Sequence, residues 1–531
     1  MCGIAGIIGK NANKDLLNQL LIPIAHRGET SYRNEILVLP GMAIGTHRLA
    51  IVDEYSGKQP VQAEQEKVFC VFNGEIYNHD ELRRQLIGDK NLLSECDSEV
   101  VLHAYLKWGD AFVHRLDGKY SIAIFDENKQ VLILARDPMG IKPLYYTRFK
   151  ENWIFASELK SLVTLKDDLI DITELEPGSI WKNGVVEPYF NLKKFTRQEI
   201  PSISIADYSL KLKNCLIKAV SKRIPEGSAK IACLLSGGID SSIITYLASQ
   251  LHQNVIAYTL AAPHMPSADL IAAQTLCQQF NIEHIIVSPP VQEMQQFYLD
   301  QGIYMTESFE PILVRNAVSY HFLCRKVADD GFKYCLNGEG ADELFGGYDF
   351  VREAPSYLQE DVIWHSLSII HKTYLQMADR ASMYTTLEAR VPYMDKDLVE
   401  LCLSLPPSTR VNGNESKVLL RQVFTNELPE SIISRRKTGM NEGAGFGINA
   451  SKESIYYQAV QAYYERHISK LEKDRELCKR IDIEEKVDLT EIEEVYNFTR
   501  FIKLNYIKLR GSQNRLQLNT RLKNSLIRTI I

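Results

Sequence analysis

The 531-residue sequence predicts two folded parts, an α+β sandwich followed by an α/β part with a parallel sheet and a helical C-terminal region. Apolar residues alternate along 119–125, 131–135 and 143–147, which is typical of strands in a sandwich. From residue 231 onward, short apolar strands alternate with helical patterns, which favours a parallel sheet. From Trp364 onward the periodicity is mostly helical.

The composition excludes several classes of protein. A net charge of −6 does not provide the excess of positive charge that nucleic-acid binding requires. No apolar run is long enough to span a bilayer. The first residues lack the basic start and apolar core of a secretory signal. The ten cysteines form no Cys-x-x-Cys pair, so neither a zinc site nor a disulfide framework is expected. We therefore expect a cytoplasmic protein that binds small molecules, with no nucleic-acid and no membrane partner.

A glycine-rich loop is the most informative stretch of the second part. The apolar run 231–235 leads into 236–242, Ser-Gly-Gly-Ile-Asp-Ser-Ser, and a helical pattern follows. Glycines allow a sharp bend, and the loop N–H groups with the helix N-terminus suit an anion. Asp240 would repel phosphate unless a divalent cation lay between them, so the loop predicts metal-bridged pyrophosphate. The alternative is a βα turn capped by Ser and Asp.

A second acidic turn follows a later strand of the same sheet. The expected elements are strands over 254–261, 283–288 and 333–336, and a helix over 270–280. The last strand leads into 337–348, which is rich in glycine and carboxylates. Asp342 there would complete a Mg²⁺ site with Asp240, because Mg²⁺ typically takes one or two carboxylates plus phosphate oxygens. Glu339 could act as a base. The alternative is an acidic surface loop.

The N-terminus offers a nucleophile. Removal of Met1 would place the Cys2 thiol beside an α-amino group, whose ordinary pKa is about 7.7. A thiol with its own base suits acyl transfer. Asn73 and Gly74 could donate to an oxyanion, although this dipeptide is more often a hairpin turn.

Three charged side chains could hold an amino acid in the same part. Arg48 offers a bidentate fork for an α-carboxylate, although an arginine is more often a surface charge. Asp97 with Glu75 could hold an α-ammonium.

The C-terminal region contains two interruptions of its helical pattern. Residues 387–395 predict a proline-bearing turn, and 435–447 form a basic, glycine-rich segment. This segment could be a lid that brings Lys437 to phosphate, or a disordered loop. From about Ser451 the chain is charged and helical, with a basic tail.

Long motifs give both parts a family resemblance. Cys2-Gly3-Ile4, the run 48–53 and the run 73–78 resemble the class II glutamine amidotransferase domain, and 135–146 with 155–160 extend the likeness. This resemblance implies an N-terminal-nucleophile αββα fold, with two antiparallel sheets between helix layers. The Ser-Gly-Gly loop resembles that of the ATP pyrophosphatases, which form an α/β parallel-sheet domain.

Together the two parts resemble the glutamine-hydrolysing asparagine synthetases, from Cys2 to about Gly447. The resemblance implies that glutamine is hydrolysed and that the ammonia passes through an internal tunnel to a carboxylate adenylated by ATP. L-aspartate is the first choice of acceptor, Mg²⁺ is implied as cofactor, and a homodimer is left open. The expected domains are 2–190 for the glutaminase, 191–204 for a linker, 205–515 for the synthetase and 516–531 for a basic tail.

The resemblance also assigns site residues. Glutamine would bind through Arg48, Ile51, Val52, Asn73, Gly74, Glu75 and Asp97, with Cys2 as nucleophile. ATP would contact Leu234, Ser236, Gly237, Gly238, Asp240, Ser241, Ser242, Leu260, Asn337, Gly338 and Tyr348. Asp240 and Asp342 would hold Mg²⁺, Glu339 would deprotonate ammonia, and Lys437 would stabilise charge on the adenylate. The acceptor would meet Arg315, Glu343 and Arg390.

The sequence departs from the family pattern at three places, and one of them bears on the substrate. Arg27-Gly28-Glu29-Thr30 replaces Arg-Gly-Pro-Asp, and Asn337 replaces a serine. The run 312–317, Ile-Leu-Val-Arg-Asn-Ala, replaces Thr-Thr-(Ile/Val)-Arg-Ala-Ser where the family positions its acceptor. The alternative is therefore another carboxylate, in cell-wall, sugar or secondary metabolism. Cys2 counts against the β-lactam-forming relatives, which lack it, and a non-catalytic regulator is the remote alternative.

Overall fold

The computed structural model describes residues 2–29, 35–53, 56–86, 92–165, 169–192, 205–263, 267–308, 310–356, 359–413 and 415–446. Most of the expected linker, the charged segment after Ser451 and the basic tail lie outside these residues. Among the described residues, no helix is both long and apolar enough to cross a membrane.

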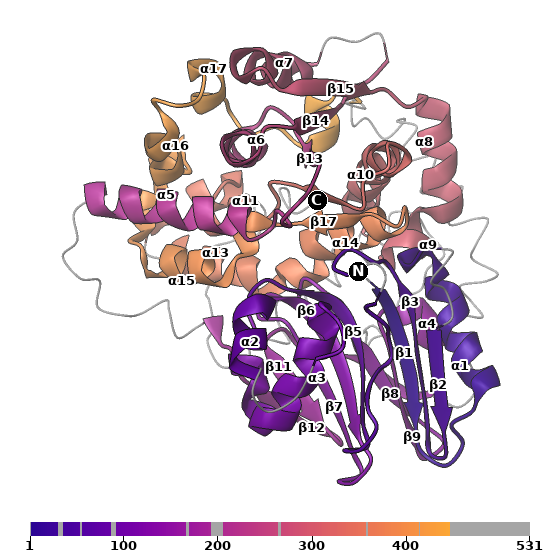
Figure 1. The fold of residues 1–531 in the computed structure, drawn as a ribbon. Helices are drawn as coiled ribbons and strands as arrows, with labels where there is room; N and C mark the ends of the chain where they lie inside the picture. The colour runs from indigo at the N-terminus through magenta and orange to yellow at the C-terminus, as the bar shows by residue number, and fades with distance from the viewer. Residues whose placement is uncertain are drawn as a thin grey trace.

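The N-terminal part is a sandwich of two six-stranded antiparallel sheets (Figure 1). The first sheet has the order β10-β8-β9-β1-β3-β2. Its strands are β1 (Cys2–Ile8), β2 (Glu35–Leu39), β3 (Met42–Arg48), β8 (Tyr145–Phe149), β9 (Asn152–Ala156) and β10 (Leu169–Glu174). The second sheet has the order β12-β11-β7-β6-β5-β4. Its strands are β4 (Val61–Ala63), β5 (Val68–Ile76), β6 (Gly118–Asp126), β7 (Val131–Arg136), β11 (Ser179–Lys182) and β12 (Val185–Pro188).

Helices cover the outer face of each sheet, which confirms the predicted αββα layers. On the first sheet lie α1 (Lys14–Leu21) and α4 (Leu159–Val163), and on the second lie α2 (His79–Leu86) and α3 (Asp97–Trp108). Strand β1 shows why the layers form. Ile4 packs between the two sheets, whereas Ala5 and Ile7 pack against α1. Because both faces of the strand are covered, apolar residues are required at nearly every position.

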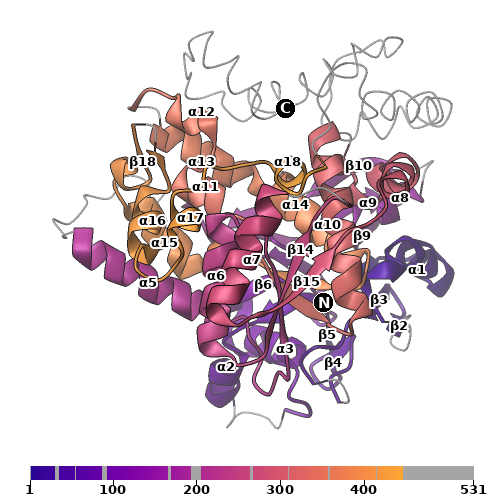
Figure 2. The same cartoon turned by 90° about the horizontal axis from the view of Figure 1, so that it is seen from above.

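The second part is built on a five-stranded parallel sheet of order β15-β14-β13-β16-β17. The strands are β13 (Ile231–Leu234), β14 (Val255–Leu260), β15 (Glu283–Val287), β16 (Tyr334–Leu336) and β17 (Glu388–Arg390). Helices α5 (Ile205–Ser221), α6 (Ile239–Leu251) and α7 (Ala268–Phe280) pack on one face, and α10 (Pro311–Asp329) packs on the other (Figure 2). Four of the five strands and the helices α6 and α7 were predicted.

Strand β17 was predicted as a turn, and that prediction was wrong. The segment Glu388-Ala389-Arg390 has only three residues, two of them charged, and Pro392 follows closely. These signals favour a turn. The strand nevertheless pairs with β16, because both charges are neutralised by partners inside the protein.

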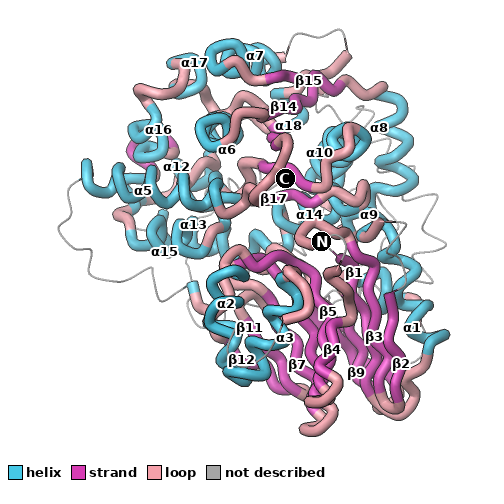
Figure 3. The backbone as a smooth tube through the Cα atoms, viewed as in Figure 1, coloured by secondary structure: helices cyan, strands magenta, loops and turns pink. Residues whose placement is uncertain are grey.

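The remaining described helices surround the parallel sheet (Figure 3). They are α8 (Val291–Phe297), α9 (Ile303–Thr306), α11 (Ala341–Phe345), α12 (Asp349–Arg352), α13 (Gln359–Ile369), α14 (Tyr374–Met383), α15 (Lys396–Ser404), α16 (Val418–Phe424), α17 (Glu430–Ile433) and α18 (Met440–Gly443). A small hairpin pairs β18 (Val411–Asn412) with β19 (Glu415–Ser416).

Buried ion pairs join the sandwich to the parallel-sheet part. Asp379 on α14 lies 2.8 Å from Arg27 Nη1 and 2.6 Å from Lys142 Nζ. Glu388 on β17 lies 2.6 Å from Lys119 Nζ. Breaking one partner of such a pair leaves an uncompensated buried charge, which is strongly destabilising. The two parts are therefore held in a defined relation, with Cys2 near their boundary (Figure 1).

Candidate functional site

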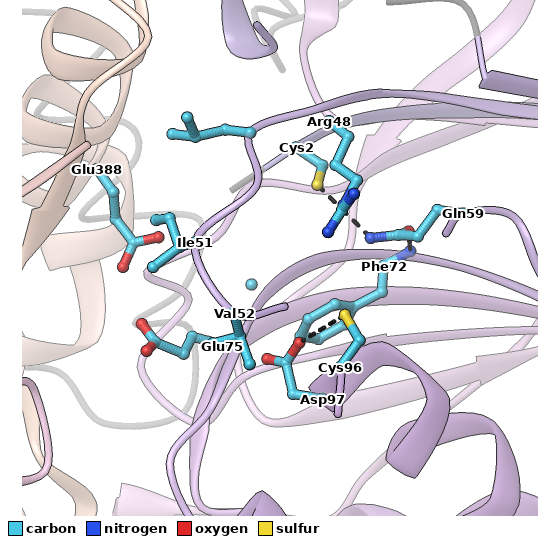
Figure 4. A pocket seen from close by; sticks show the side chains of 12 residues that line it. Cys2, Arg48, Ile51, Val52, Gln59, Phe72, Glu75, Cys96, Asp97 and Glu388 are labelled. Carbon is cyan, nitrogen blue, oxygen red and sulfur yellow. Dashed lines mark hydrogen bonds between the residues drawn. The ribbon is translucent and has the colours of Figure 1, made fainter. Parts of the chain in front are cut away.

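The structure brings most of the predicted glutamine residues to one pocket in the sandwich, here called the Cys2 pocket (Figure 4). Its lining residues are Cys2, Arg48, Leu49, Ile51, Val52, Gln59, Phe72, Gly74, Glu75, Cys96, Asp97 and Glu388. They come from the strands β1, β3 and β5, from the loops after β3 and before α3, from the start of α3 and from β17. The pocket is therefore assembled by tertiary structure.

Cys2 is buried, and polar side chains contact its backbone and its sulfur. The Cys2 backbone N–H donates to Asn73 Oδ1 over 3.1 Å, and Gln59 Nε2 donates to the sulfur over 3.6 Å. Asn73 does not line the pocket but lies behind Cys2, where its Nδ2 donates to Ser121 Oγ over 3.3 Å. Arg27 Nε donates to the Cys2 carbonyl over 3.1 Å. These bonds hold the backbone of Cys2 and leave its sulfur on the pocket wall.

Charges of opposite sign face the Cys2 pocket. Arg48 is nearly fully buried, and its Nη2 donates to the Asp53 carbonyl over 2.6 Å. Asp97 opens α3 and accepts from the Ile76 N–H over 3.0 Å, and burial raises the pKa of its carboxyl. Burial also raises the pKa of Glu75 to about 8, although the neighbouring Arg390 acts to lower it. The pocket therefore offers a guanidinium and two carboxyl groups, as a zwitterionic amino acid requires.

Two polar residues of this pocket were not predicted from the sequence. Gln59 lies in a stretch between strands without a recognisable motif, and Glu388 belongs to the distant strand β17. One signal could have drawn attention to Glu388: a Glu-Ala-Arg trio stands between the apolar residues Leu387 and Val391. Charges within an apolar context indicate buried, paired groups.

The predicted phosphate loop lies between β13 and α6. Gly237 has a φ of +69°, a conformation that glycine adopts without strain. The Ser236 N–H and the Ser241 hydroxyl lie 3.1 Å apart, which closes the loop on itself. A Cβ atom on Gly338 would lie 2.8 Å from the Ser241 nitrogen, so the turn after β16 packs directly against this loop. The two loops follow the neighbouring parallel strands β13 and β16, and the predicted residues Leu234 and Leu260 end the strands β13 and β14.

Two carboxylates and two lysines converge at these loops. Lys417 Nζ lies 2.5 Å from Asp240 Oδ2 and 2.6 Å from Asp342 Oδ1, and Lys437 Nζ lies 2.5 Å from Asp342 Oδ2. Burial alone would raise the pKa of Asp342, but the two ammonium groups hold it below its ordinary value. Lys417 was missed, because it stands in a segment between β19 and α16 with no glycine-rich or acidic motif.

Two glutamates flank this cluster. Burial raises the pKa of Glu339 to about 7, and Lys437 acts to lower it. Burial likewise raises the pKa of Glu343 to about 8, and its carboxyl accepts from the Tyr348 hydroxyl over 2.6 Å. Asn337, which replaces the family serine, is buried and turned inward, because its Nδ2 donates to Tyr320 and its Oδ1 accepts from the Glu339 N–H.

Each of the three residues predicted for the acceptor has its own partners in the structure. Arg315 on α10 lies 3.0 Å from Glu442 on α18. Arg390 is fully buried, with its guanidinium 2.6 Å from Glu75 of the Cys2 pocket and 2.8 Å from Glu388. The charge of Arg390 is thus paired with two carboxylates between the sandwich and the parallel sheet, and its contact with the acceptor stays a prediction.

Comparison with known proteins supports the family resemblance of both parts of the chain. The family described as "Glutamine amidotransferase domain" matches residues 1–187, and "Asparagine synthase" matches 211–367 and 354–497. The nodule asparagine synthetase of Pisum sativum is 30% identical over 84% of this chain and 79% of its own. A probable asparagine synthetase of Schizosaccharomyces pombe is 32% identical over 77% of this chain and 78% of its own. The Bos taurus asparagine synthetase is 30% identical over 88% of both chains. The chain thus belongs to the family of glutamine-hydrolysing asparagine synthetases, in which a glutamine amidotransferase domain is joined to an asparagine synthase domain.

Proposed function

We propose that this chain hydrolyses glutamine and uses the ammonia to amidate L-aspartate, which ATP has adenylated, with release of asparagine, AMP and pyrophosphate. One observation carries the proposal. The Cys2 pocket and the Asp240–Asp342 cluster lie in two parts of one molecule that buried ion pairs join. Ammonia must be released near its acceptor, because ammonium formed in water is not a nucleophile.

In the sandwich, the Cys2 thiol would attack the glutamine carboxamide. The α-amino group exposed by loss of Met1 would accept the thiol proton. Gly74 lines the pocket, and Asn73 lies within hydrogen-bond distance of Cys2, so both are near the place where the oxyanion develops. Arg48 would hold the α-carboxylate, while Asp97 and Glu75 would hold the α-ammonium.

In the parallel-sheet part, the loop 236–242 would hold pyrophosphate while the acceptor carboxylate is adenylated. The side chains present fit Mg²⁺. Asp240 and Asp342 both reach one cationic atom, and Asp240 Oδ1 is buried without a hydrogen-bond partner. Mg²⁺ bound by these carboxylates would neutralise phosphate charge. Glu339 would accept a proton from the attacking nitrogen, and Lys437 would stabilise negative charge on the adenylate.

The identity of the acceptor is the most specific part of the proposal. Arg315 and Glu442 form a pair of opposite charges, which suits the α-carboxylate and α-ammonium of an amino acid such as aspartate. Leu313 is buried in the core around α10, so its departure from the family pattern concerns packing. Ile312 is only partly buried and is the change that bears on acceptor choice, which keeps another carboxylate as the second candidate.

A product screen tests the proposal. The purified protein is incubated with ATP, Mg²⁺, glutamine and a panel of carboxylates, and the products are read by mass spectrometry. Asparagine, AMP and pyrophosphate in equal amounts are expected with aspartate. Absence of asparagine at saturating aspartate, with AMP formed from another carboxylate, would replace aspartate by that acceptor. Absence of AMP with every acceptor would contradict the enzymatic function.

A further inference from the structure

The Cys2 pocket is completed by the other part of the chain. All but one of its lining residues lie between positions 2 and 97, and the exception is Glu388. Figure 4 shows the Glu388 carboxylate on the same side of the pocket as Glu75, across from Cys2. Glu388 lies on β17, the edge strand of the parallel sheet, and is about 1% exposed.

Cations from both parts hold the Glu388 side chain. Its Oε1 lies 2.6 Å from Lys119 Nζ, on β6 of the sandwich, and 2.8 Å from Arg390 Nε. Lys119 Nζ also lies 3.3 Å from the Ala389 carbonyl. The position of the carboxylate is thus determined by β6 and β17 together.

Arg390 links Glu388 to Glu75. Its Nη2 lies 2.6 Å from Glu75 Oε2, yet neither atom has the alignment of a hydrogen bond, and both are buried. The close approach supplies charge attraction without the directional bond that would lock Glu75 in place. The Glu75 and Glu388 carboxyl groups also lie within hydrogen-bond reach of each other, so the two glutamates and Arg390 form one connected cluster.

Glu75 and Glu388 form the acidic end of the pocket. Their carboxyl groups lie beside two cations, Lys119 and Arg390, and Arg48 also lines the pocket. Burial raises the pKa of Glu75 to about 8, so its carboxyl holds a proton at neutral pH in the empty pocket. A ligand ammonium would displace that proton and pair with the ionised carboxylate.

We propose that Glu388 is a positioning residue for glutamine. Through the shared Arg390 it orients Glu75, so that the carboxylates at this end receive the α-ammonium of glutamine. The glutamine site is then complete only with the parallel-sheet part in place. This inference rests on the proposed function, since it takes glutamine as the nitrogen donor.

The test compares two amides in the full-length protein. Glutamine carries the α-ammonium, and glutaramate is the same amide without it. In Glu388→Gln, the KM for glutamine should rise about tenfold while kcat changes little, because a charge-assisted contact is weakened in binding. The KM for glutaramate should stay at the wild-type value. Glu388→Asp, which keeps the charge, should recover part of the glutamine affinity.

Lysine variants provide a matched pair. Lys119→Met removes a cation that holds Glu388 in place and should raise the KM for glutamine, as Glu388→Gln does, without changing the KM for glutaramate. Lys142→Met is the control. Lys142 pairs with the buried Asp379, which does not line the pocket, so this change should lower Tm without changing the KM for glutamine. An equal rise in KM for both amides in Glu388→Gln, or no rise for glutamine, would overturn the inference. A wild-type protein that hydrolyses no glutamine would instead contradict the proposed function.

Discussion

The ammonium of Lys417 lies 2.5 Å from a carboxylate oxygen of Asp240, and so joins the segment before α16 to the phosphate loop. The backbone of Lys417 has a φ of +58°, in the left-handed region that side chains rarely adopt. Such a conformation costs on the order of 1–3 kcal/mol and persists where the surroundings determine it. The contacts with Asp240 and Asp342 offset this cost and place the lysine where phosphate charge would develop.

Replacing Lys417 should therefore disable synthesis. In Lys417→Met we expect ATP-dependent synthesis to fall by about 100-fold or more, because loss of one preorganised charge-stabilising donor has that effect. Glutamine hydrolysis should persist. The rates of asparagine and glutamate formation are measured in the same sample. Lys213→Met, which removes a partly exposed ion pair with Glu427, is the control and should keep both rates. Unimpaired synthesis in Lys417→Met would contradict this role.

Cys2→Ala should abolish glutamine-dependent synthesis and leave synthesis from added ammonium salts largely intact. The thiol serves only the Cys2 pocket, and free ammonia bypasses that step. The two nitrogen sources are compared by asparagine formation at saturating ATP. Loss of both activities in a folded variant would speak against two separate sites.

Removing either carboxylate of the proposed Mg²⁺ site should stop ATP cleavage. Asp240→Asn and Asp342→Asn should each abolish formation of AMP and pyrophosphate, yet leave glutamine hydrolysis measurable, because the Cys2 pocket is untouched. Nucleotide products are separated by chromatography. Stoichiometric ADP from the wild type would show that the loop does not act as a pyrophosphate loop.

Glutamine affinity should rise with pH up to about 8. Burial raises the pKa of Glu75 to about 8, so its carboxyl is protonated at lower pH. Binding of the glutamine α-ammonium favours the ionised form of Glu75. Below pH 8 the Glu75 carboxyl must first lose its proton, so the affinity for glutamine falls by up to about tenfold per pH unit. Calorimetry on Cys2→Ala between pH 6 and 8 measures this slope. Glu75→Gln should bind more weakly and without the slope, and a persisting slope would assign the proton to another group.

Ile312 should set part of the acceptor preference. Ile312→Thr restores a hydroxyl beside Arg315 and should lower the KM for aspartate about tenfold, since a hydrogen bond to a charged group contributes about 1.5–3 kcal/mol. Leu313→Thr is the matched variant. It should lower Tm without improving aspartate use, because Leu313 is packed in the core. Steady-state kinetics and thermal unfolding separate the two effects, and equal KM changes would refute the distinction.

Local sequence was sufficient for features that depend on neighbours in the chain. The strand, glycine turn and helix around 231–251 follow from an apolar run, two glycines and helical periodicity, all within about twenty residues. The turn between β13 and α6 and the parallel sheet could therefore be predicted, and pyrophosphate binding by that turn stays a prediction. Cys2 stood out for the same reason, because its proposed reactivity arises from its own α-amino group.

Only tertiary structure decided which distant charges meet. Lys417 lies in no motif, and Lys417, Glu388 and Arg390 each contact a residue that lies far away in sequence, namely Asp240, Lys119 and Glu75. A buried charge is tolerated only where an opposite charge compensates its lost hydration, so its role depends on packing between segments. For that reason the position of Arg390 beside Glu75 was not predicted. For the same reason β17, a strand of two charges and one alanine, was predicted as a turn.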